Sequence, residues 1–244
     1  MKTTKVLQTN VSQTSIDEVS NILNKTAGNR IAICNANTLV RSARNSDIAD
    51  LINNFTIKTP DGFPVAKALS ILTKQNFPRV DGYKVFLQTI EDGLDRNRSH
   101  YFFGSDEPTT ELMIKNLKKD YPEIQISGYI CPEFMESDQL VEKYADEIEN
   151  INADIVWVSL GFPKQEMFID QVKKRIDINS NFVGIGGVFE WVAGTKKKAP
   201  EWVADIGLEW LFRLVQDPKR LYKRYLIDNT LFIVYFFRQL LFRR

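Results

Sequence analysis

The sequence of 244 residues is poor in the residue types that usually build metal sites and disulfide frameworks. It contains two cysteines, Cys34 and Cys131, and a single histidine, His100. Two distant cysteines have neither the number nor the spacing of a zinc site or a disulfide framework. We therefore expect free thiols in a reducing compartment. Nothing near His100 completes a triad or a metal site, so we expect that residue to be structural.

The usual motifs of nucleotide chemistry are also missing. The sequence has neither the G-x-G-x-x-G fingerprint of dinucleotide-binding domains nor a P-loop. It also lacks any Asp-x-Asp pair, the arrangement that often holds a metal ion on a nucleotide diphosphate. We therefore predict no metal and no cofactor, and we expect a bound diphosphate to be neutralised by arginine, lysine or backbone amides.

Long apolar runs are absent from the first 200 residues. The polar N-terminus lacks the apolar core of a signal peptide, and no segment there is long enough to span a bilayer. We expect a cytoplasmic protein, or one attached peripherally to the inner face of the cell membrane. Hydrophobic residues make up 43% of the chain, which is enough for a sizeable core.

Short apolar runs alternate with longer segments of helical spacing. Continuous apolar character suits strands covered on both faces, as in a parallel sheet, and the alternation is typical of a doubly wound α/β fold. We predict a Rossmann-like parallel sheet flanked by helices over residues 1–195, and a helical appendage over residues 196–244. The expected strands are 30–34, 101–103, 124–126, 154–158 and 181–185, and the expected helices include 108–119, 138–149 and 164–176.

Polar and glycine-rich loops follow these strands. Because the carboxyl ends of parallel strands share one edge of the sheet, we expect the loops to converge on a nucleotide-type ligand site. Glycines after two of the strands can bring backbone amides close to a phosphate, although tight strand-to-helix turns also use glycine. The candidates on this rim are Asn35, Asn37, Gly104, Ser105, Gln165, Gly186 and Glu190.

Two charged residues lie in turns between the strands. Asp61 follows Thr59-Pro60 and precedes glycine, so it is either a general base on a hydroxyl or a structural Asx-turn residue. Arg79 can clamp a carboxylate or a phosphate through two hydrogen bonds, or it can simply pair with Asp81. The local sequence leaves both pairs of alternatives open.

The C-terminal segment is basic and aromatic. Between residues 213 and 244 the only acidic residues are Asp217 and Asp228, whereas arginine, lysine, tyrosine and phenylalanine are abundant. This composition suits the headgroup region of an anionic leaflet, and Arg238 ends the apolar stretch too soon for a span. We expect it to lie on the membrane, with packing on its own domain or on a sister subunit as the alternative. No known motif supports nucleic-acid binding.

The motifs together resemble the WecG/TagA/CpsF family of bacterial glycosyltransferases over roughly residues 10–228. Each motif is weak alone, but the ordered set is specific, above all in residues 207–213. The matching segments are residues 35–38, 61–64, 79–82, 103–105, 161–166, 184–194, 199–202, 207–214 and 217–220.

The resemblance implies an inverting reaction that needs no metal. A sugar of the N-acetylmannosamine, mannosaminuronate, glucose or glucuronate type would move from a UDP-sugar to an undecaprenyl-diphosphate-linked saccharide. The products would be cell-surface polysaccharides such as teichoic acid, capsule or exopolysaccharide. The family resemblance also implies a Rossmann-like core with an appendage that completes the site near the membrane; it leaves a homo-oligomer open.

The same resemblance assigns roles to single residues. Asp61 matches the family's proposed base, and Asn37, Arg79 and Gln165 match residues of its substrate pocket. The arginines that match the positions expected to meet a diphosphate are Arg213, Arg220 and Arg224.

The sequence departs from the family pattern at a few positions. Asn35 stands where teichoic-type members often have threonine, and Glu190 replaces a frequent aspartate. Residues 63–64 look more like those of capsule and exopolysaccharide members. These departures affect the expected donor sugar more than the reaction class. Two other functions stay open: a nucleotide-cofactor oxidoreductase, and a non-catalytic adaptor on a membrane surface.

Overall fold

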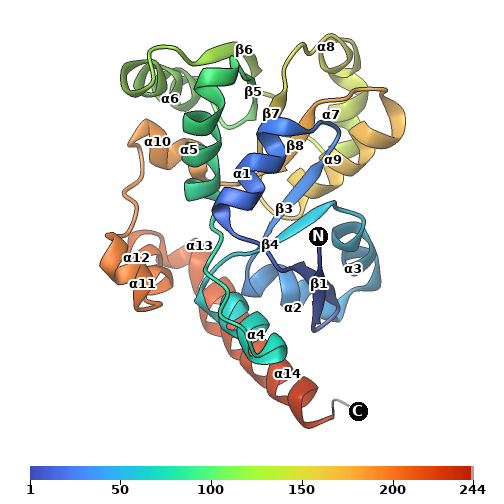
Figure 1. The fold of residues 1–244 in the computed structure, drawn as a ribbon, viewed down its shortest axis with the longest axis vertical. Helices are drawn as coiled ribbons and strands as arrows, with labels where there is room; N and C mark the ends of the chain where they lie inside the picture. Colours follow the sequence, from blue (N-terminus) through green and yellow to red (C-terminus); the bar gives the residue numbers. More distant parts are fainter. Residues whose placement is uncertain (243–244) are drawn as a thin grey trace.

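A six-stranded parallel sheet forms the centre of the molecule (Figure 1). The computed structural model describes residues 1–242, without the side chains of Asp205, Arg220 and Arg224. The strands lie in the order β4-β3-β8-β7-β5-β6, and the predicted α/β class is confirmed. Their bounds are β3 (Arg30–Cys34), β4 (Ile57–Pro60), β5 (Ser99–Gly104), β6 (Gln125–Ile130), β7 (Ile155–Ser159) and β8 (Asn181–Gly184).

Apolar side chains on both faces of the strands create two cores. In β7, Ile155 and Trp157 belong to one buried cluster, whereas Val156 and Val158 belong to the other. Successive side chains of a strand point to opposite faces, so a strand that is apolar throughout must be covered on both sides.

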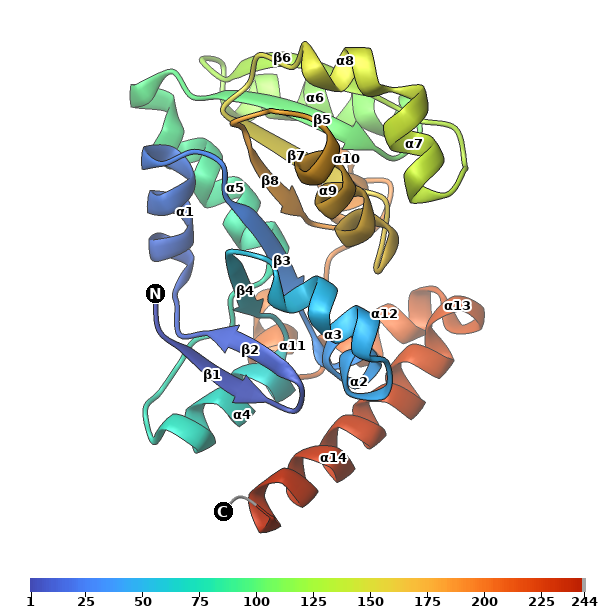
Figure 2. The same ribbon diagram turned by 90° about the vertical axis from the view of Figure 1, so that its right-hand side faces the viewer.

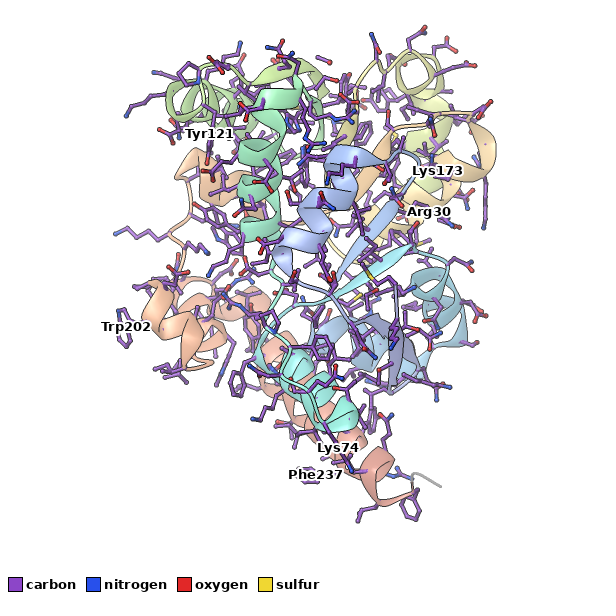
Figure 3. The ribbon with its side chains drawn as sticks, in the orientation of Figure 1. Arg30, Lys74, Tyr121, Lys173, Trp202 and Phe237 are labelled. Carbon is purple, nitrogen blue, oxygen red and sulfur yellow. The ribbon has the colours of Figure 1, made fainter. Side chains whose placement is uncertain are left out.

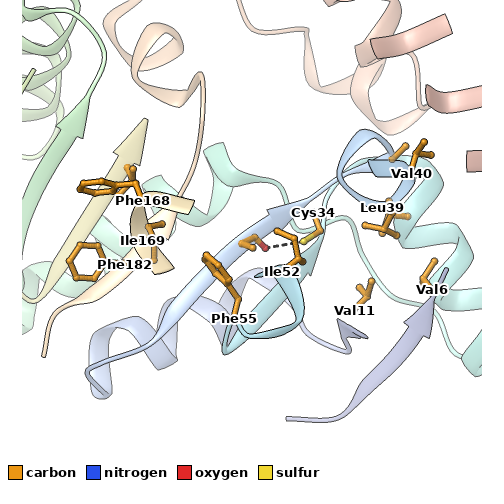
Figure 4. Close-up of a cluster of buried hydrophobic side chains, with 14 of the residues drawn as sticks. Val6, Val11, Cys34, Leu39, Val40, Ile52, Phe55, Phe168, Ile169 and Phe182 are labelled. Carbon is orange, nitrogen blue, oxygen red and sulfur yellow. Dashed lines mark hydrogen bonds between the residues drawn. The ribbon is translucent and has the colours of Figure 1, made fainter. Parts of the chain in front are cut away.

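Each face has its own set of helices. One face is covered by α1 (Ile16–Lys25), α5 (Gly82–Gly93), α6 (Glu107–Asp120) and α10 (Val188–Ala193). The short 3₁₀ turn η1 (Leu94–Arg96) continues α5. The other face carries α2 (Ala36–Arg44), α3 (Ser46–Asn53), α4 (Phe63–Thr73), α7 (Ser137–Lys143), α8 (Ala145–Glu149) and α9 (Lys164–Arg175). Figure 4 shows part of the core on this second face, where Phe168 and Phe182 lie on one side of Phe55 and Leu39 on the other.

Several elements differ from the sequence expectation. The segment 138–149 is two helices, α7 and α8, rather than one. A hairpin of β1 (Thr3–Val6) and β2 (Thr9–Ser12) precedes the sheet, and the edge strand β4 was not expected. Strand β4 contains Lys58, so its sequence does not have a continuous apolar pattern. The ammonium group of Lys58 donates to the Phe55 carbonyl at 2.7 Å.

The single histidine lies in the core. His100 is 1% exposed, and its Nδ1 accepts a hydrogen bond from Trp157 Nε1 at 3.1 Å. Burial lowers the pKa of His100 to about 4, so the ring is neutral at pH 7. Its burial and its hydrogen bond to Trp157 give His100 a structural role, as expected.

The C-terminal helices return to the body of the protein. They are α11 (Glu201–Asp205), α12 (Glu209–Gln216), α13 (Pro218–Tyr222), the π-helical η2 (Lys223–Asp228) and α14 (Asn229–Leu241). Figure 2 shows α14 running beneath α2. Phe232 and Phe236 enter the core of the second face. The predicted boundary at residue 195 stays a prediction, but α14 shares a core with the residues before it.

The far end of α14 is fixed to the N-terminal hairpin. Gln239 Oε1 accepts from the Leu7 backbone N–H at 2.8 Å, and Gln239 Nε2 donates to the Lys5 carbonyl at 2.8 Å. One side chain thus satisfies two backbone groups of the β1–β2 turn. Across residues 1–242, no helix combines the length and the apolar character that a bilayer crossing needs.

Candidate functional site

A cleft of two adjoining cavities opens at the carboxyl end of the sheet. The first cavity encloses about 590 Å³ with its open mouth included, and the appendage helices line it together with the loops after β3 and β4. The second cavity continues beneath the loops after β7 and β8. Helix α2 after β3 and helix α10 after β8 leave for opposite faces, so the cleft lies at the crevice where α/β sheets bind ligands. Both cavities are lined by Asn35, Asp61, Glu209 and Arg213.

Asp61 lies where the two cavities meet. Its backbone N–H donates to the Cys34 carbonyl of the neighbouring strand at 3.0 Å, and Gly62, with φ of +79°, turns the chain into α4. Among the described residues, no hydrogen bond engages its carboxylate, so a ligand hydroxyl can approach it. The carboxylate of Asp61 therefore faces a cavity.

Burial raises the pKa of Asp61 to about 6, with further increases from the charges of Asp81 and Glu209. Arg79 and Arg213 act in the opposite direction. A carboxyl with a pKa close to neutral is ionised at pH 7 and still basic enough to accept a proton in a reaction. Perturbed groups of this kind, placed in a cleft, are typical of functional sites.

Arg79 ties two segments of the cleft together. Its Nη2 donates to Asp81 Oδ2 at 3.1 Å, and its Nη1 donates to Glu209 at the start of α12. Asp81 also caps α5 by accepting from the Lys84 N–H at 3.0 Å. From the sequence, Arg79 was expected either to bind a ligand carboxylate or phosphate, or to form an ion pair with Asp81. The structure contains the Asp81 pair, and Arg79 also lines the first cavity.

Arg213 has few close partners among the described residues of the cleft. Its guanidinium carbon lies 4.8 Å from the Trp191 ring centroid and 6.0 Å from that of Tyr225. Its Nη1 is 4.0 Å from Glu209 Oε1, a loose pairing. Aromatic faces hold a guanidinium without using its N–H donors. No hydrogen bond to a described residue uses those donors, so they can bind an anionic ligand.

The predicted pocket residue Gln165 supports the loop after β8. It is 4% exposed, its Oε1 accepts from the Gly186 N–H at 3.0 Å, and its Nε2 donates to Glu166 Oε1 at 2.9 Å. A Cβ atom at Gly184 would lie 2.8 Å from Gln165 Nε2, so a larger residue there would displace the Gln165 side chain. Gln165 and Gly186 both line the second cavity, and their predicted ligand contacts stay predictions.

The two asparagines of the loop after β3 are held in different ways. Asn35 caps α2 by accepting from the Thr38 N–H at 3.3 Å. Asn37 Nδ2 donates to Asp228 Oδ2 at 2.5 Å, which links α2 to the end of η2. Both asparagines line the first cavity.

Glu190 and the pair Gly104 and Ser105 occupy different surroundings. Glu190 lines the second cavity, and it pairs with Lys196 at 2.6 Å. Gly104 and Ser105 lie outside both cavities of the cleft. The Ser105 N–H already donates to the Ser159 carbonyl at 3.1 Å, and a Cβ at Gly104 would lie 2.4 Å from that oxygen. The glycine here serves close strand packing, and its predicted phosphate role stays a prediction.

Two of the predicted arginines cannot be placed in the site. Arg220 is in α13 and Arg224 is in η2, but their side chains lie outside the described residues. Within the described part of the chain, no group of three or more histidine, cysteine, aspartate or glutamate side chains is arranged to hold a metal ion. The predicted absence of a metal stays a prediction.

Comparison with known proteins places the chain in a family. A sequence model of the glycosyl transferase WecG/TagA/CpsF family matches residues 4–244. A protein of Bacillus subtilis (strain 168), named N-acetylglucosaminyldiphosphoundecaprenol N-acetyl-beta-D-mannosaminyltransferase, is 27% identical over 190 residues, which are 78% of this chain and 72% of that protein.

Two further relatives carry the same name. The one from Bacillus spizizenii (strain ATCC 23059 / NRRL B-14472 / W23) is 31% identical over 164 residues, 66% of this chain and 61% of the relative. The one from Staphylococcus aureus (strain MW2) is 27% identical over 175 residues, 70% of this chain and 66% of the relative. The predicted resemblance is confirmed: the chain belongs to the WecG/TagA/CpsF family of glycosyltransferases.

Proposed function

We propose that this glycosyltransferase moves a sugar from a UDP-sugar to an undecaprenyl-diphosphate-linked saccharide, with inversion and without a metal ion. The names of the relatives support a lipid-linked saccharide as acceptor. The observation that carries the proposal is the position of Asp61, a carboxylate without a hydrogen bond among the described residues, beside Arg213 in a cleft that the appendage helices complete.

In this proposal each substrate occupies one cavity. The nucleotide lies along the second cavity, beneath the glycine-rich loop 184–187, and the acceptor saccharide occupies the first cavity, next to the appendage. Arg213 lines both cavities and faces the donor diphosphate. Asp61 lies at their junction, where the acceptor hydroxyl meets the anomeric carbon.

The reaction is a single displacement. Asp61 takes the proton of the acceptor hydroxyl as the hydroxyl oxygen forms its bond to the anomeric carbon. The bond from that carbon to the UDP oxygen breaks at the same time, and UDP leaves with the electron pair. Arg213 binds the charge that develops on UDP, which is the stage at which electrostatic stabilisation accelerates a reaction. Attack from the side opposite UDP inverts the anomeric centre.

A donor panel tests the proposed reaction. We expect UDP release that depends on a lipid-linked acceptor for one of the UDP-sugars of N-acetylmannosamine, mannosaminuronate, glucose or glucuronate. The measurement is coupled UDP detection after EDTA treatment, which also tests metal independence. Release of no UDP with any of these four donors would contradict the proposed donor class, and loss of UDP release after EDTA treatment would contradict metal independence.

The outer surface of the appendage suits a membrane. Trp202 is 68% exposed and Val215 is 75% exposed, and Figure 3 shows Trp202 pointing away from the protein. In α12, Glu209 and Arg213 line the cleft, whereas Leu211 and Val215 are exposed. A helix with a polar inner side and an apolar outer side is suited to lie on a bilayer. We propose that this surface contacts the anionic leaflet that holds the acceptor.

Truncation is a poor test of this contact, because α14 contributes Phe232 and Phe236 to the core. We instead expect the double variant Trp202→Glu/Val215→Glu to bind anionic vesicles about tenfold more weakly, since it removes two apolar side chains from the contact. Vesicle co-sedimentation measures the effect. Phe134→Glu, which changes a 96% exposed phenylalanine outside the appendage, is the matched control. Unchanged vesicle binding by the double variant would contradict the proposal.

A further inference from the structure

One contact between the appendage and the pocket has no part in the mechanism above. Asn37, in the first turn of α2, donates from Nδ2 to Oδ2 of Asp228 at 2.5 Å. Asp228 ends η2, so the two residues are 191 positions apart in the chain. The contact joins a residue that lines the first cavity to the segment that leads into α14.

The chemistry of this pair fixes which way the Asn37 amide points. An ionised carboxylate only accepts hydrogen bonds, so the NH₂ group of Asn37, and not its carbonyl oxygen, must face Asp228. The Oδ1 atom lies on the other branch of the planar amide. Within the described part of the chain, nothing donates to that oxygen. It is therefore the hydrogen-bonding atom that Asn37 keeps for a ligand.

Asn35 has the opposite arrangement. Its Oδ1 accepts from the backbone N–H of Thr38 at 3.3 Å, so its carbonyl oxygen, and not its NH₂ group, faces the start of α2. Asn35 therefore keeps its NH₂ group for the cavity. Two asparagines at the start of α2 thus present one acceptor and one donor to the same cavity, and only the acceptor depends on the appendage.

We propose that Asp228 is a positioning residue for the transfer reaction: it holds Asn37 so that Oδ1 accepts a hydrogen bond from a hydroxyl or amide N–H of the acceptor sugar. This inference rests on the proposed function. Without the carboxylate, the amide of Asn37 is free to turn its NH₂ group into the cavity, where two donors would face each other. Asp228 therefore determines that Asn37 presents a hydrogen-bond acceptor, and not a donor, to the pocket, although Asp228 itself does not contact the substrate.

The variant Asp228→Asn tests the inference, because an asparagine accepts from or donates to Asn37 equally well. We expect the KM for the lipid-linked acceptor to rise about two- to threefold, because about half of the molecules then turn the NH₂ group of Asn37 into the cavity, and kcat to change less than KM. A rise in KM alone indicates lost binding that the ground and transition states share. The measurement is steady-state UDP release with the acceptor varied.

Exchanging the two side chains distinguishes two roles of Asp228: orienting the amide of Asn37, and attaching the appendage to the core. In Asp228→Asn/Asn37→Asp, the new carboxylate accepts from residue 228 and still presents an oxygen to the cavity, so we expect a KM close to that of wild type and below that of Asp228→Asn. Asn37→Asp alone sets two carboxylates against each other and should be the worst of the three. Gln239→Leu breaks the other anchor of α14 and should leave the acceptor KM unchanged.

Each outcome has one meaning. An unchanged KM in Asp228→Asn, a swap no better than either single variant, or a KM rise in Gln239→Leu as large as that in Asp228→Asn would overturn the inference and leave the proposed function standing. A wild-type protein that releases no UDP with any donor and lipid-linked acceptor would overturn both. Thermal unfolding midpoints of all variants identify any that fail to fold.

Discussion

Replacing Asp61 with asparagine is expected to lower kcat by a factor on the order of 10²–10⁴, the usual contribution of a general base. Asparagine has the same shape but cannot take a proton from the acceptor hydroxyl. Nothing among the described residues hydrogen-bonds to the Asp61 carboxylate, so the variant should remain folded. Single-turnover transfer to a lipid-linked acceptor measures the effect.

The pH dependence gives a second measure of the same residue. Burial raises the pKa of Asp61 to about 6, and the base is active only when ionised. The kcat/KM of the wild-type enzyme should therefore fall as the pH drops below about 6, and the residual activity of Asp61→Asn should lack this fall. Asp50→Asn, at an exposed aspartate of α3, is the matched control. Near-normal turnover by folded Asp61→Asn would refute the base assignment.

Replacing Arg213 with glutamine is expected to lower kcat on the order of 10²–10³, as does the loss of one preorganised donor to a developing oxyanion. Arg213 is stacked on Trp191 and only loosely paired with Glu209, so its charge is available to the departing UDP. Arg213→Lys keeps the charge but loses the planar fork of donors, and its kcat should be intermediate. Rapid-quench measurement of the transfer step separates this effect from product release.

The matched control for Arg213 is Arg175→Gln, which changes an arginine at the end of α9 that lies outside both cavities of the cleft. It should keep the wild-type kcat. Full turnover by Arg213→Gln would show that the charge of UDP is neutralised by another group. Arg220 and Arg224 would then be the next residues to change.

Within the six-stranded sheet, the strands that the sequence predicted and the one that it missed differ in a simple physical way. β7 is apolar at every position from Ile155 to Val158 because helices cover both of its faces. β4 lies at an edge, contains Lys58 and ends at Pro60, a residue that sheets tolerate at edges. Its apolar pattern is therefore weak. The local sequence predicted the turn at Asp61, but not the strand β4 that positions this turn.

In the site, too, some residues could be predicted from the local sequence and others could not. Asp61 and Asn37 were predictable because they belong to local motifs after strands. The distant partners of Arg79 and Asn37 were not predictable: Glu209 is 130 positions from Arg79, and Asp228 is 191 positions from Asn37. The local sequence around Glu209 and Asp228 does not indicate which distant side chain each one meets. The packing of α12 and η2 against the rest of the protein decides it.

The attachment of α14 has a consequence for how the two surfaces of the appendage communicate. Asp228, directly before α14, accepts a hydrogen bond from Asn37 of the pocket, and Phe237 within α14 is 59% exposed. Thermodynamic linkage is reciprocal. If docking of α14 favours the saccharide by some factor, the bound saccharide must favour the docked helix by the same factor. A partner that binds only the docked helix would therefore bind more tightly once the pocket is filled. Occupancy of the pocket would then set how long the enzyme stays on that partner.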